Sequence, residues 1–578
     1  MKTRLHSLGL ASAIALAALL SSCTTTPSTP PARPRLVVFL VVDGLPMRQV
    51  TGYREQLAPD GLARFLDRGT WFADAHYGHA FTVTAAGHAT MLSGAYPHRS
   101  GIIGNDWRDP VSGELTYCTG DTSATYIGNE TKKLDGTSPK NLRVETVGDV
   151  LRRVDARSKV IGISGKDRGA VLPAGKTGTA YMFMAGSGGF ASSTFYMPKH
   201  PAWVDSFNAA KPADRYFKAE WTPTLAESAY AASLPDSQPW FGPGPGKLPM
   251  TMGSGEKPGP AFYNSLLGSP FIDELTLAFA RAAIAGEQLG QDDLPDILSV
   301  SLSGHDYVNH AWSAESRLSH DHLLKLDRML QEFFAYLDAT VGKDNYLAVL
   351  TADHGFMPAP EVSRARGLDA GRINLGETLT RLNAELEKRF ATPKLALYSS
   401  ASTLVLDKKL IAQKGLSFDT VAGAARDFFL AEPGFAAAYT RTEITSRSRA
   451  GAPFFDAVLK AWNADLSGDI QVVLKPNWMF AGTSITTHGS PYPYDTNVPI
   501  LFYGRRGRAP GASTSASKSS TSRRRCRPCS AWPRRPLRRA SCCRSARGKR
   551  CPVAAVAAAT AAGPCRPTGR TPRPCPSG

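Results

Sequence analysis

Three nearly continuous apolar runs along the chain each end abruptly in acidic or histidine residues. The runs cover residues 35–42, 297–302 and 346–350. Runs this rich in β-branched residues are typical of strands buried on both faces of a parallel sheet. Because ligands bind just outside the carboxyl ends of strands in open α/β sheets, the polar residues that follow the three runs are predicted to share one site.

Helical and irregular segments fill the rest of the chain. Helices are predicted over residues 316–337 and 379–390, and a segment rich in Pro and Gly over 203–271 is interpreted as an insertion. Residues 402–406 and 418–430 are strand-like and helix-like runs within a predicted smaller subdomain. The predicted fold class is α/β, with a central, mostly parallel sheet flanked by helices, plus this smaller α+β subdomain.

The predicted organisation follows from these segments. A catalytic α/β domain with the insertion is expected over residues 35–358, the α+β subdomain over 359–465, a return to the catalytic domain over 466–508, and a basic low-complexity tail over 509–578.

The N-terminus resembles a bacterial lipoprotein export signal. Lys2 and Arg4 precede an apolar stretch over residues 8–20 and then Cys23. This pattern predicts a signal peptide over 1–22, lipidation of Cys23 and a flexible tether over 23–34. An ordinary cleaved signal with an incidental cysteine is the alternative. We therefore expect a lipoprotein on the periplasmic side of a bacterial membrane, sorted to the outer membrane, with the membrane as a partner.

The net charge and the cysteines lie mostly in the tail. From Arg505 onward the chain has 17 Arg, 2 Lys and no acidic residue, so the formal net charge of +18 leaves −1 for the preceding 504 residues. We therefore expect no nucleic-acid binding by the body. Of nine cysteines only Cys23 and Cys118 precede the tail, and Cys118 is predicted to be a packed thiol without a catalytic role.

The chemistry of the body depends on six acidic and histidine side chains. Asp306 and His310 are four residues apart, which places both on one face of a helical turn. Asp353 and His354 follow a predicted strand directly, where a turn can direct both side chains at one ion. Asp43 and His488 complete a set of N and O ligands. Three protein ligands for each of two metals would leave an open position on each, as catalytic zinc sites require.

Seven motifs in order along residues 36–504 make the chain similar to the PafA-type alkaline phosphatases. This group belongs to a superfamily that also holds nucleotide pyrophosphatases and phosphodiesterases. The motifs are Asp-Gly at 43–44, Thr-Ala-Ala-Gly-His at 84–88, Gly-Asn-Asp-Trp at 104–107, Ser-Gly-Lys-Asp-Arg at 164–168, Asp-Tyr-Val-Asn-His at 306–310, Ala-Asp-His-Gly at 352–355 and Thr-His-Gly-Ser at 487–490.

The resemblance implies two Zn²⁺ ions and a threonine nucleophile. One zinc would be bound by Asp306, His310 and His488, and the other by Asp43, Asp353, His354 and the Thr84 oxygen. Thr84 would attack phosphorus and form a phosphothreonine that water then hydrolyses. Mn or Co also suits such a ligand set.

The assignment of Thr84 as the nucleophile has two alternatives. Thr82 is a local rival, although the spacing to His88 favours Thr84. Thr84 would stand at a helix start, where free amides favour an anion. A helix cap without catalytic role is the other alternative.

Three further residues predict the type of ester. Asn105, Lys166 and Arg168 match the substrate-binding positions of the monoesterase branch, and an Arg with a Lys suits the dianion of a phosphate monoester. His305, His320 and His322 match no ligand position, and we interpret them as solvent-exposed or packing residues.

The tail departs from the family. Where relatives continue into a closing helix, residues after about 509 are rich in Arg, Ser, Pro and Cys. One hypothesis is a one-base frameshift, since permissible codons for residues 517–526, read one base earlier, encode a family-like apolar segment. The nucleotide sequence tests this. A basic arm for nucleic acid or acidic lipid and a metal-binding tail stay open, although only Cys526 and Cys529 have Cys-x-x-Cys spacing.

The predicted function is metal-dependent hydrolysis of phosphate monoesters. The alternatives are a phosphodiesterase or nucleotide pyrophosphatase of the same superfamily, and an inactive or metal-binding lipoprotein.

Overall fold

The computed structural model describes residues 33–504. The predictions for the signal peptide, for Cys23 and for the tail lie outside this range. The elements below all belong to the compact unit that begins at Arg35. Within the described residues, no helix combines the length and the apolar character needed to cross a membrane.

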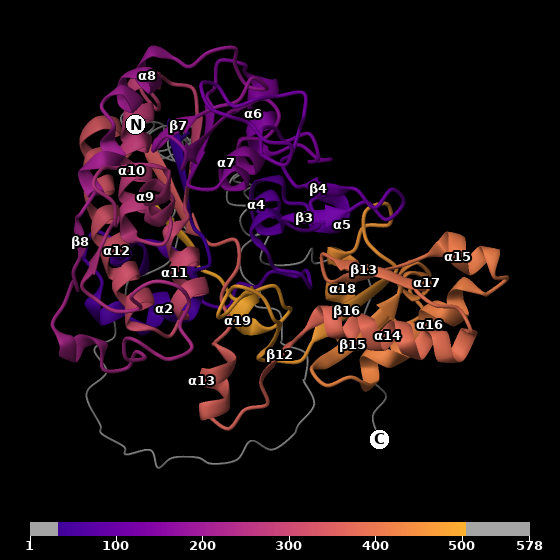
Figure 1. Cartoon of the computed structure of the whole chain (residues 1–578). Coiled ribbons are helices and arrows are strands. Elements are labelled where there is room, and N and C mark those ends of the chain that lie inside the picture. The colour runs from indigo at the N-terminus through magenta and orange to yellow at the C-terminus, as the bar shows by residue number, and fades with distance from the viewer. Residues whose placement is uncertain (1–32, 505–578) are drawn as a thin grey trace, which may run out of the picture. The chain divides into compact units, whose positions relative to one another are not determined.

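An eight-stranded sheet forms the centre of the fold (Figure 1). Its strands, in spatial order, are β2 (Thr70–Phe72), β18 (Ile500–Tyr503), β11 (Tyr346–Thr351), β1 (Leu36–Val42), β10 (Asp296–Leu302), β5 (Val160–Ser164), β6 (Thr179–Met184) and β7 (Gly189–Ala191). The five strands from β11 to β6 are parallel, and the other three are antiparallel to their neighbours. The predicted fold class is confirmed.

The three apolar runs of the sequence are neighbouring strands in this sheet. β1 lies between β10 and β11, and Val41 pairs with both Ser301 and Thr351. Every residue of the three strands is buried, which explains their nearly continuous apolar sequences. Their carboxyl ends therefore lie side by side at one edge of the sheet.

Helices lie around the central sheet (Figure 1). They are α2 (Met47–Gly52), α3 (Ala63–Arg68), α4 (Thr84–Ser93), α5 (Pro97–Ser100), α6 (Val147–Val154), α7 (Asp167–Ala174), α8 (Ala202–Ala209), α9 (Pro260–Leu266), α10 (Pro270–Glu287), α11 (Gly304–Trp312), α12 (Arg317–Leu337), α13 (Pro360–Ala365) and α19 (Pro493–Thr496). In Figure 1, α10 and α12 lie together at the left, and α4, α6 and α7 lie together nearer the centre. The predicted helix over 316–337 is α12, capped by the Ser316 hydroxyl, which accepts from Ser319 N.

The segment over 203–271 contains only short elements, among them β8 (Glu220–Trp221) and β9 (Met250–Thr251). It is fastened to the body at Asp321 of α12, whose carboxylate accepts hydrogen bonds from Trp221 and from two further donors of the segment. A mostly irregular chain of this length needs such anchors, because it forms little backbone pairing of its own.

A smaller α+β subdomain follows, as predicted. Its antiparallel sheet has the order β13 (Ala396–Ser400), β14 (Thr403–Leu406), β16 (Ile470–Leu474) and β15 (Phe435–Thr440). Its helices are α14 (Leu375–Phe390), α15 (Lys408–Gln413), α16 (Phe418–Ala431), α17 (Arg441–Ser446) and α18 (Phe455–Ala461). Helix α14 begins four residues before the predicted 379, because the Asn374 side chain caps it by accepting from Glu377 N.

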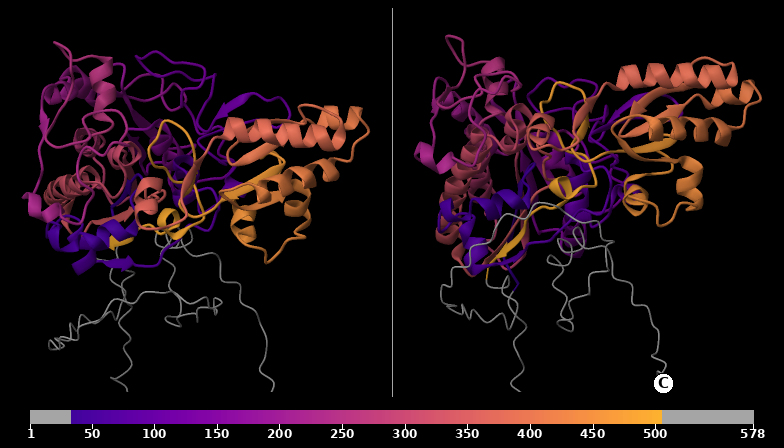
Figure 2. Two further views of the ribbon diagram at one scale, coloured as in Figure 1. Left: turned by 60° about the horizontal axis from the view of Figure 1, so that its bottom comes forward. Right: turned by 90° about the horizontal axis from the view of Figure 1, so that it is seen from below.

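Side chains of the small sheet alternate between two cores. Ala438 and Val472 face the core formed with α14 and α16, whereas Ala437 and Val473 face a second core with α18 and with Ala80, a residue four positions before Thr84. In Figure 2 the strands of the subdomain lie between its long helix and further helices. β16 begins after residue 465, and the domain boundaries themselves stay predictions.

Candidate active site

The end of strand β1 makes a tight turn that brings two of the predicted ligands together. Gly44 follows Asp43 with a φ of +72°, a left-handed conformation that favours glycine. A Cβ atom on Gly44 would lie 3.0 Å from Asp306 Oδ1 and 3.2 Å from the Phe356 ring. The glycine thus lets the β1 loop lie directly against the carboxylate that follows β10.

Lys166 bridges two buried carboxylates across this edge. Its Nζ lies 2.7 Å from Asp43 Oδ2 and 2.5 Å from Asp306 Oδ2. The third carboxylate, Asp353, accepts hydrogen bonds at Oδ1 from Gly44 N at 3.0 Å and from His354 N at 3.1 Å. One oxygen of each carboxylate is left without a hydrogen-bond partner: Asp43 Oδ1, Asp306 Oδ1 and Asp353 Oδ2. Unpartnered buried carboxylate oxygens are costly unless a cation binds them.

The three predicted histidine ligands all hold the same tautomer. Nδ1 lies 2.9 Å from Thr486 O in His310, 2.9 Å from Gly355 O in His354 and 2.8 Å from Thr82 O in His488. A carbonyl oxygen only accepts, so each Nδ1 carries a hydrogen, and Nε2 of a neutral ring keeps its lone pair. This is the arrangement of histidines that bind a metal through Nε2.

The free imidazole nitrogens face the free carboxylate oxygens. Nε2 of His310 lies 3.4 Å and Nε2 of His488 3.6 Å from Asp306 Oδ1. Nε2 of His354 lies 3.4 Å from Asp353 Oδ2 and 3.5 Å from Asp43 Oδ1. Lone pairs on both sides of such short distances repel unless a cation lies between them, so these residues fit a divalent metal of the zinc type.

Five of the six predicted ligands converge in two overlapping groups. Asp43, Asp353 and His354 form one group, and Asp306, His354 and His488 form the other, each with ligand atoms within 4.8 Å of one another. His354 belongs to both groups, and its ring stacks on His488 with 3.3 Å between centroids. His310 is outside the second group although it contacts Asp306. The predicted division into two sets of three ligands stays a prediction.

Burial and charge act differently on the two carboxylates that Lys166 bridges. Burial, followed by the charge of Asp353, raises the pKa of Asp43 despite the opposing charge of Lys166. Burial alone would also raise the pKa of Asp306. The charges of Lys166 and of the three histidines outweigh this effect, so the pKa of Asp306 is well below its ordinary value.

Thr84 lies beside these ligands at the start of α4. Its Oγ1 is 3.5 Å from His354 Nε2. Val83 is the N-cap residue and no side chain caps the helix, so the reading of Thr84 as a helix cap is wrong. The hydroxyl of the rival Thr82 donates to Ser490 O at 2.9 Å and is therefore not directed at the metal-ligand residues by any hydrogen bond.

Two features of α4 were not assigned roles from the sequence. The carbonyl of Thr84 lies 2.9 Å from Nδ1 of His88, which is also 3.3 Å from Asp353 Oδ2. Gly87 allows α4 to approach the loop after β11, because a Cβ there would lie 2.2 Å from Asp353 O. The Thr-x-x-Gly-His spacing was the available signal for both.

Of the predicted substrate-binding residues, Asn105 lies at the same helix start, Lys166 lies at the bridged carboxylates and Arg168 lies on α7. Asn105 Oδ1 accepts from Ala85 N at 2.9 Å, which leaves its amide hydrogens free to donate. Arg168 Nη1 donates to the Tyr117 hydroxyl at 3.1 Å, and this hydroxyl donates to Asp167 at 2.8 Å. Tyr117 was not singled out from the sequence. Lys166 is the residue that bridges the two carboxylates.

The other predicted side chains are in the interior. His305, His320 and His322 are buried, so the expectation of solvent exposure is wrong for all three and that of packing is correct. Their burial is tolerated because each ring has a polar partner. His305 pairs with Gln49 and His322, and His320 pairs with Ser233 and Gln56. Cys118 is a free, buried thiol, and burial raises its pKa to about 12.

The fold and the site define the class of protein. Clustered carboxylates and imidazoles at the strand ends, with a hydroxyl at a helix start beside them, are typical of metal-dependent α/β hydrolases. Residues 37–496 match the model of the type I phosphodiesterase / nucleotide pyrophosphatase family. The chain belongs to this family.

Within the family the chain is similar to alkaline phosphatases. It is 34% identical to alkaline phosphatase PafA of Elizabethkingia meningoseptica, over 82% of this chain and 87% of PafA. It is 33% identical to alkaline phosphatase PhoV of Synechococcus elongatus, over 82% of this chain and 86% of PhoV. The crystal structure of wild-type PafA matches with a TM-score of 0.76 and 33% identity, over 82% of this chain and 92% of that one.

Proposed function

We propose that this protein hydrolyses phosphate monoesters with bound divalent metal ions, through a covalent phosphothreonine at Thr84, and releases inorganic phosphate. The observation that carries the proposal is the position of Thr84 Oγ1, 3.5 Å from His354 Nε2 and beside five converging ligand side chains. The similarity to PafA and PhoV supports the same reaction class.

The chain's own residues account for nucleophile and substrate binding. Metal ions bound by Asp306, His310 and His488 and by Asp43, Asp353 and His354 would supply Lewis-acid stabilisation of charge on the phosphoryl oxygens. The Thr84 hydroxyl loses its proton to water, and Oγ1 forms the new bond to phosphorus as the bond to the alcohol oxygen breaks and this oxygen takes up a proton. Water later displaces Oγ1, which is protonated again, and phosphate is released. The amides at the start of α4, apart from that of Ala85, which donates to Asn105, stabilise the anionic group.

The residues around Thr84 favour a monoester. Asn105 has free amide hydrogens to donate to one unesterified oxygen, and Arg168 is held in place by Tyr117. A monoester dianion matches this positive charge better than a diester with one negative charge. Rates for an aryl phosphate and its matched diaryl ester test the preference, and a faster diester would favour the phosphodiesterase alternative.

A pair of threonine variants tests the nucleophile. Thr84→Ala is expected to abolish phosphoenzyme in acid-quenched protein analysed by mass spectrometry, and to lower kcat more than about 100-fold. Thr82→Ala is the matched control, and it is expected to keep the phosphoenzyme on residue 84. Metal content of both variants is measured in parallel. A phosphoenzyme that persists in Thr84→Ala would remove Thr84 from this role.

A metal-depletion experiment addresses the inactive alternative. Chelator treatment is expected to abolish hydrolysis, and zinc is expected to restore it. Activity that survives complete metal removal would contradict the proposal.

We also propose export and lipid anchoring at Cys23. The sequence alone supports this, through Lys2, Arg4 and the apolar stretch before Cys23. Metabolic labelling with radioactive palmitate should label the wild-type protein and not Cys23→Ser, and equal labelling of both would contradict it.

A further inference from the structure

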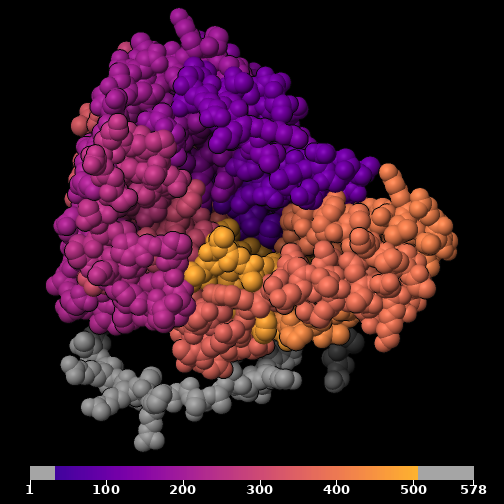
Figure 3. All heavy atoms as spheres, viewed as in Figure 1, coloured from indigo at the N-terminus to yellow at the C-terminus, as the bar shows by residue number. Residues whose placement is uncertain are grey.

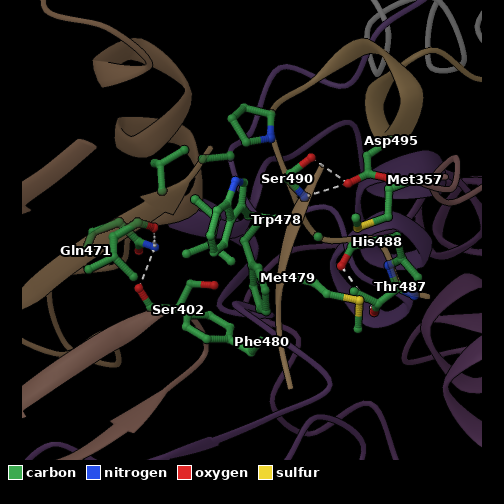
Figure 4. A pocket seen from close by; sticks show the side chains of 17 residues that line it. Met357, Ser402, Gln471, Trp478, Met479, Phe480, Thr487, His488, Ser490 and Asp495 are labelled. Atoms are coloured by element: carbon green, nitrogen blue, oxygen red, sulfur yellow. Dashed lines mark hydrogen bonds between the residues drawn. The ribbon is translucent and has the colours of Figure 1, made fainter. Parts of the chain in front are cut away.

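A pocket lies beside the candidate active site, between the small subdomain and the loop that carries His488. Its volume is about 70 Å³. Trp478, Met479 and Phe480 of β17 (Trp478–Phe480) lie between Gln471 and Ser402 on one side and Thr487 and His488 on the other (Figure 4). Figure 3 shows the yellow segment that precedes β18 at the surface, between the purple and orange parts of the chain.

The lining of this pocket is more apolar than polar, and it contains no Lys or Arg. Its aromatic members are Phe81, Trp478 and Phe480, and its one carboxylate is that of Asp495. The carboxylate of Asp495 accepts from Ser490 N at 2.9 Å and from its hydroxyl at 2.6 Å, and burial raises the pKa of Asp495 to about 7. A second anionic group on a ligand would find no counter-charge here.

Two polar side chains of the pocket already donate hydrogen bonds to protein groups. Gln471 donates its side-chain amide to Ser402 O at 2.9 Å, which Figure 4 shows as a dashed line. The indole N–H of Trp478 donates to Asp369 at 3.1 Å. The pocket therefore offers carbon surface and an aromatic ring, and the group that fits it best is neutral, apolar and flat.

Phe81 links the pocket to the phosphate-binding residues. Its ring lies 3.3 Å from the position that a Cβ on Gly489 would take, and 3.5 Å from the equivalent position on Gly104. Gly489 follows the ligand His488, and Gly104 precedes Asn105. The pocket thus borders the site at the residues that flank both the metal-ligand group and the phosphate-binding amide.

We propose that this pocket binds the alcohol part of the phosphate ester and selects esters whose alcohol is an uncharged, apolar aromatic group. This proposal rests on the proposed function, because it assumes a phosphate group bound between Thr84 and Asn105. A nucleoside polyphosphate is disfavoured as a substrate, because its further phosphates would enter a pocket without basic residues.

The test compares phenyl phosphate, 2-naphthyl phosphate and 4-carboxyphenyl phosphate. The second ring adds apolar surface, so kcat/KM for the naphthyl ester is expected to exceed that for the phenyl ester about 5- to 10-fold, while the carboxylate lowers kcat/KM. Phe81→Ala and Phe480→Ala are expected to move the naphthyl-to-phenyl ratio toward 1. The ratio is measured on one preparation, so partial misfolding of a variant cancels.

Phe428→Ala is the matched control. Phe428 is a half-buried phenylalanine of the same subdomain, on α16, and it does not line this pocket. It is expected to leave the ratio unchanged. A wild-type ratio of 1 or less, or equal ratios in wild type and both pocket variants, would overturn the proposal.

Calorimetric binding of phenylphosphonate and 2-naphthylphosphonate repeats the comparison without turnover. Tighter binding of the naphthyl compound, lost in Phe480→Ala, supports the pocket even if no ester is hydrolysed, and that outcome would refute only the proposed function. Equal binding of the two phosphonates overturns the pocket assignment.

Discussion

Asp321 offers a sharp test of how the long irregular segment is fastened to the catalytic body. Its buried carboxylate accepts three hydrogen bonds, from Trp221 Nε1, Thr224 N and the Tyr230 hydroxyl, each at 2.6 Å. Burial, followed by the hydrogen bond to Asp321, raises the pKa of Tyr230, so its hydroxyl stays protonated as a donor.

The magnitude follows from the number of donors left behind. Hydrogen bonds to a charged acceptor contribute about 1.5–3 kcal/mol each and are not additive. Asp321→Ala leaves three donors without their acceptor, two of them on buried side chains, so it is expected to lower the free energy of unfolding by about 3–5 kcal/mol. Asp321→Asn keeps one acceptor oxygen, but its amide hydrogens face the donors. We therefore expect this variant to lower the free energy of unfolding by about 2–3 kcal/mol.

The consequence should reach the active site. Trp221 packs with Val308 and Trp312 of α11, the helix that carries Asp306 and His310. Urea unfolding followed by tryptophan fluorescence reports on this cluster, and metal content after dialysis reports on the ligands. We expect an earlier unfolding midpoint and weaker metal retention in Asp321→Ala.

Glu332→Gln on the same helix is the control. Glu332 is exposed and lies 3.9 Å from Arg281, so its loss is expected to change stability by no more than about 1 kcal/mol. The reasoning is refuted if Asp321→Ala unfolds at the same urea concentration as Glu332→Gln.

Two further predictions follow from buried groups. Burial lowers the pKa of His320 to about 4, so the folded protein resists a proton that the unfolded chain binds below a pH of about 6.5. Stability is therefore fully present above pH 6.5 and lost as the pH falls toward 4, and His320→Gln should lose less stability between pH 7.5 and 5 in urea titrations; an identical loss would contradict this. Gly87→Ala should lower kcat/KM and metal content sharply, because the new methyl would displace the Asp353 backbone. Gly423→Ala, in the open middle of a helix, is its control and should stabilise the protein by about 0.5–1 kcal/mol; equal activity of the two variants would contradict the close approach at Gly87.

The sequence by itself determined the elements of the fold and the kind of chemistry at their ends. The apolar runs became β1, β10 and β11 with nearly the predicted limits, because burial on both faces leaves a continuous apolar pattern. The four-residue spacing of Asp306 and His310 was enough to place both on one helical turn. Local signals of this type depend only on neighbours along the chain.

Tertiary structure alone decided which atoms are free to bind. The Nδ1 partners of His310 and His488 are backbone carbonyls far away in the sequence, whereas that of His354 is the carbonyl of the next residue. Each of the three carboxylates keeps one oxygen without a hydrogen-bond partner, which no local pattern predicts. The hydrogen bond from Arg168 to Tyr117 and the buried pair of His305 and His322 also join residues that are not neighbours along the chain. No periodicity encodes these contacts, because they arise where separate loops pack together.

The pocket beside the site is the clearest example. Its walls come from residues near 80, 357, 402, 471–480 and 487–495, segments that share no motif and that lie side by side only after the small subdomain has packed against α5 and the loop before α4. The periodicity of a segment predicts which of its own residues are buried. The shape and charge of a cavity depend instead on which distant segments enclose it.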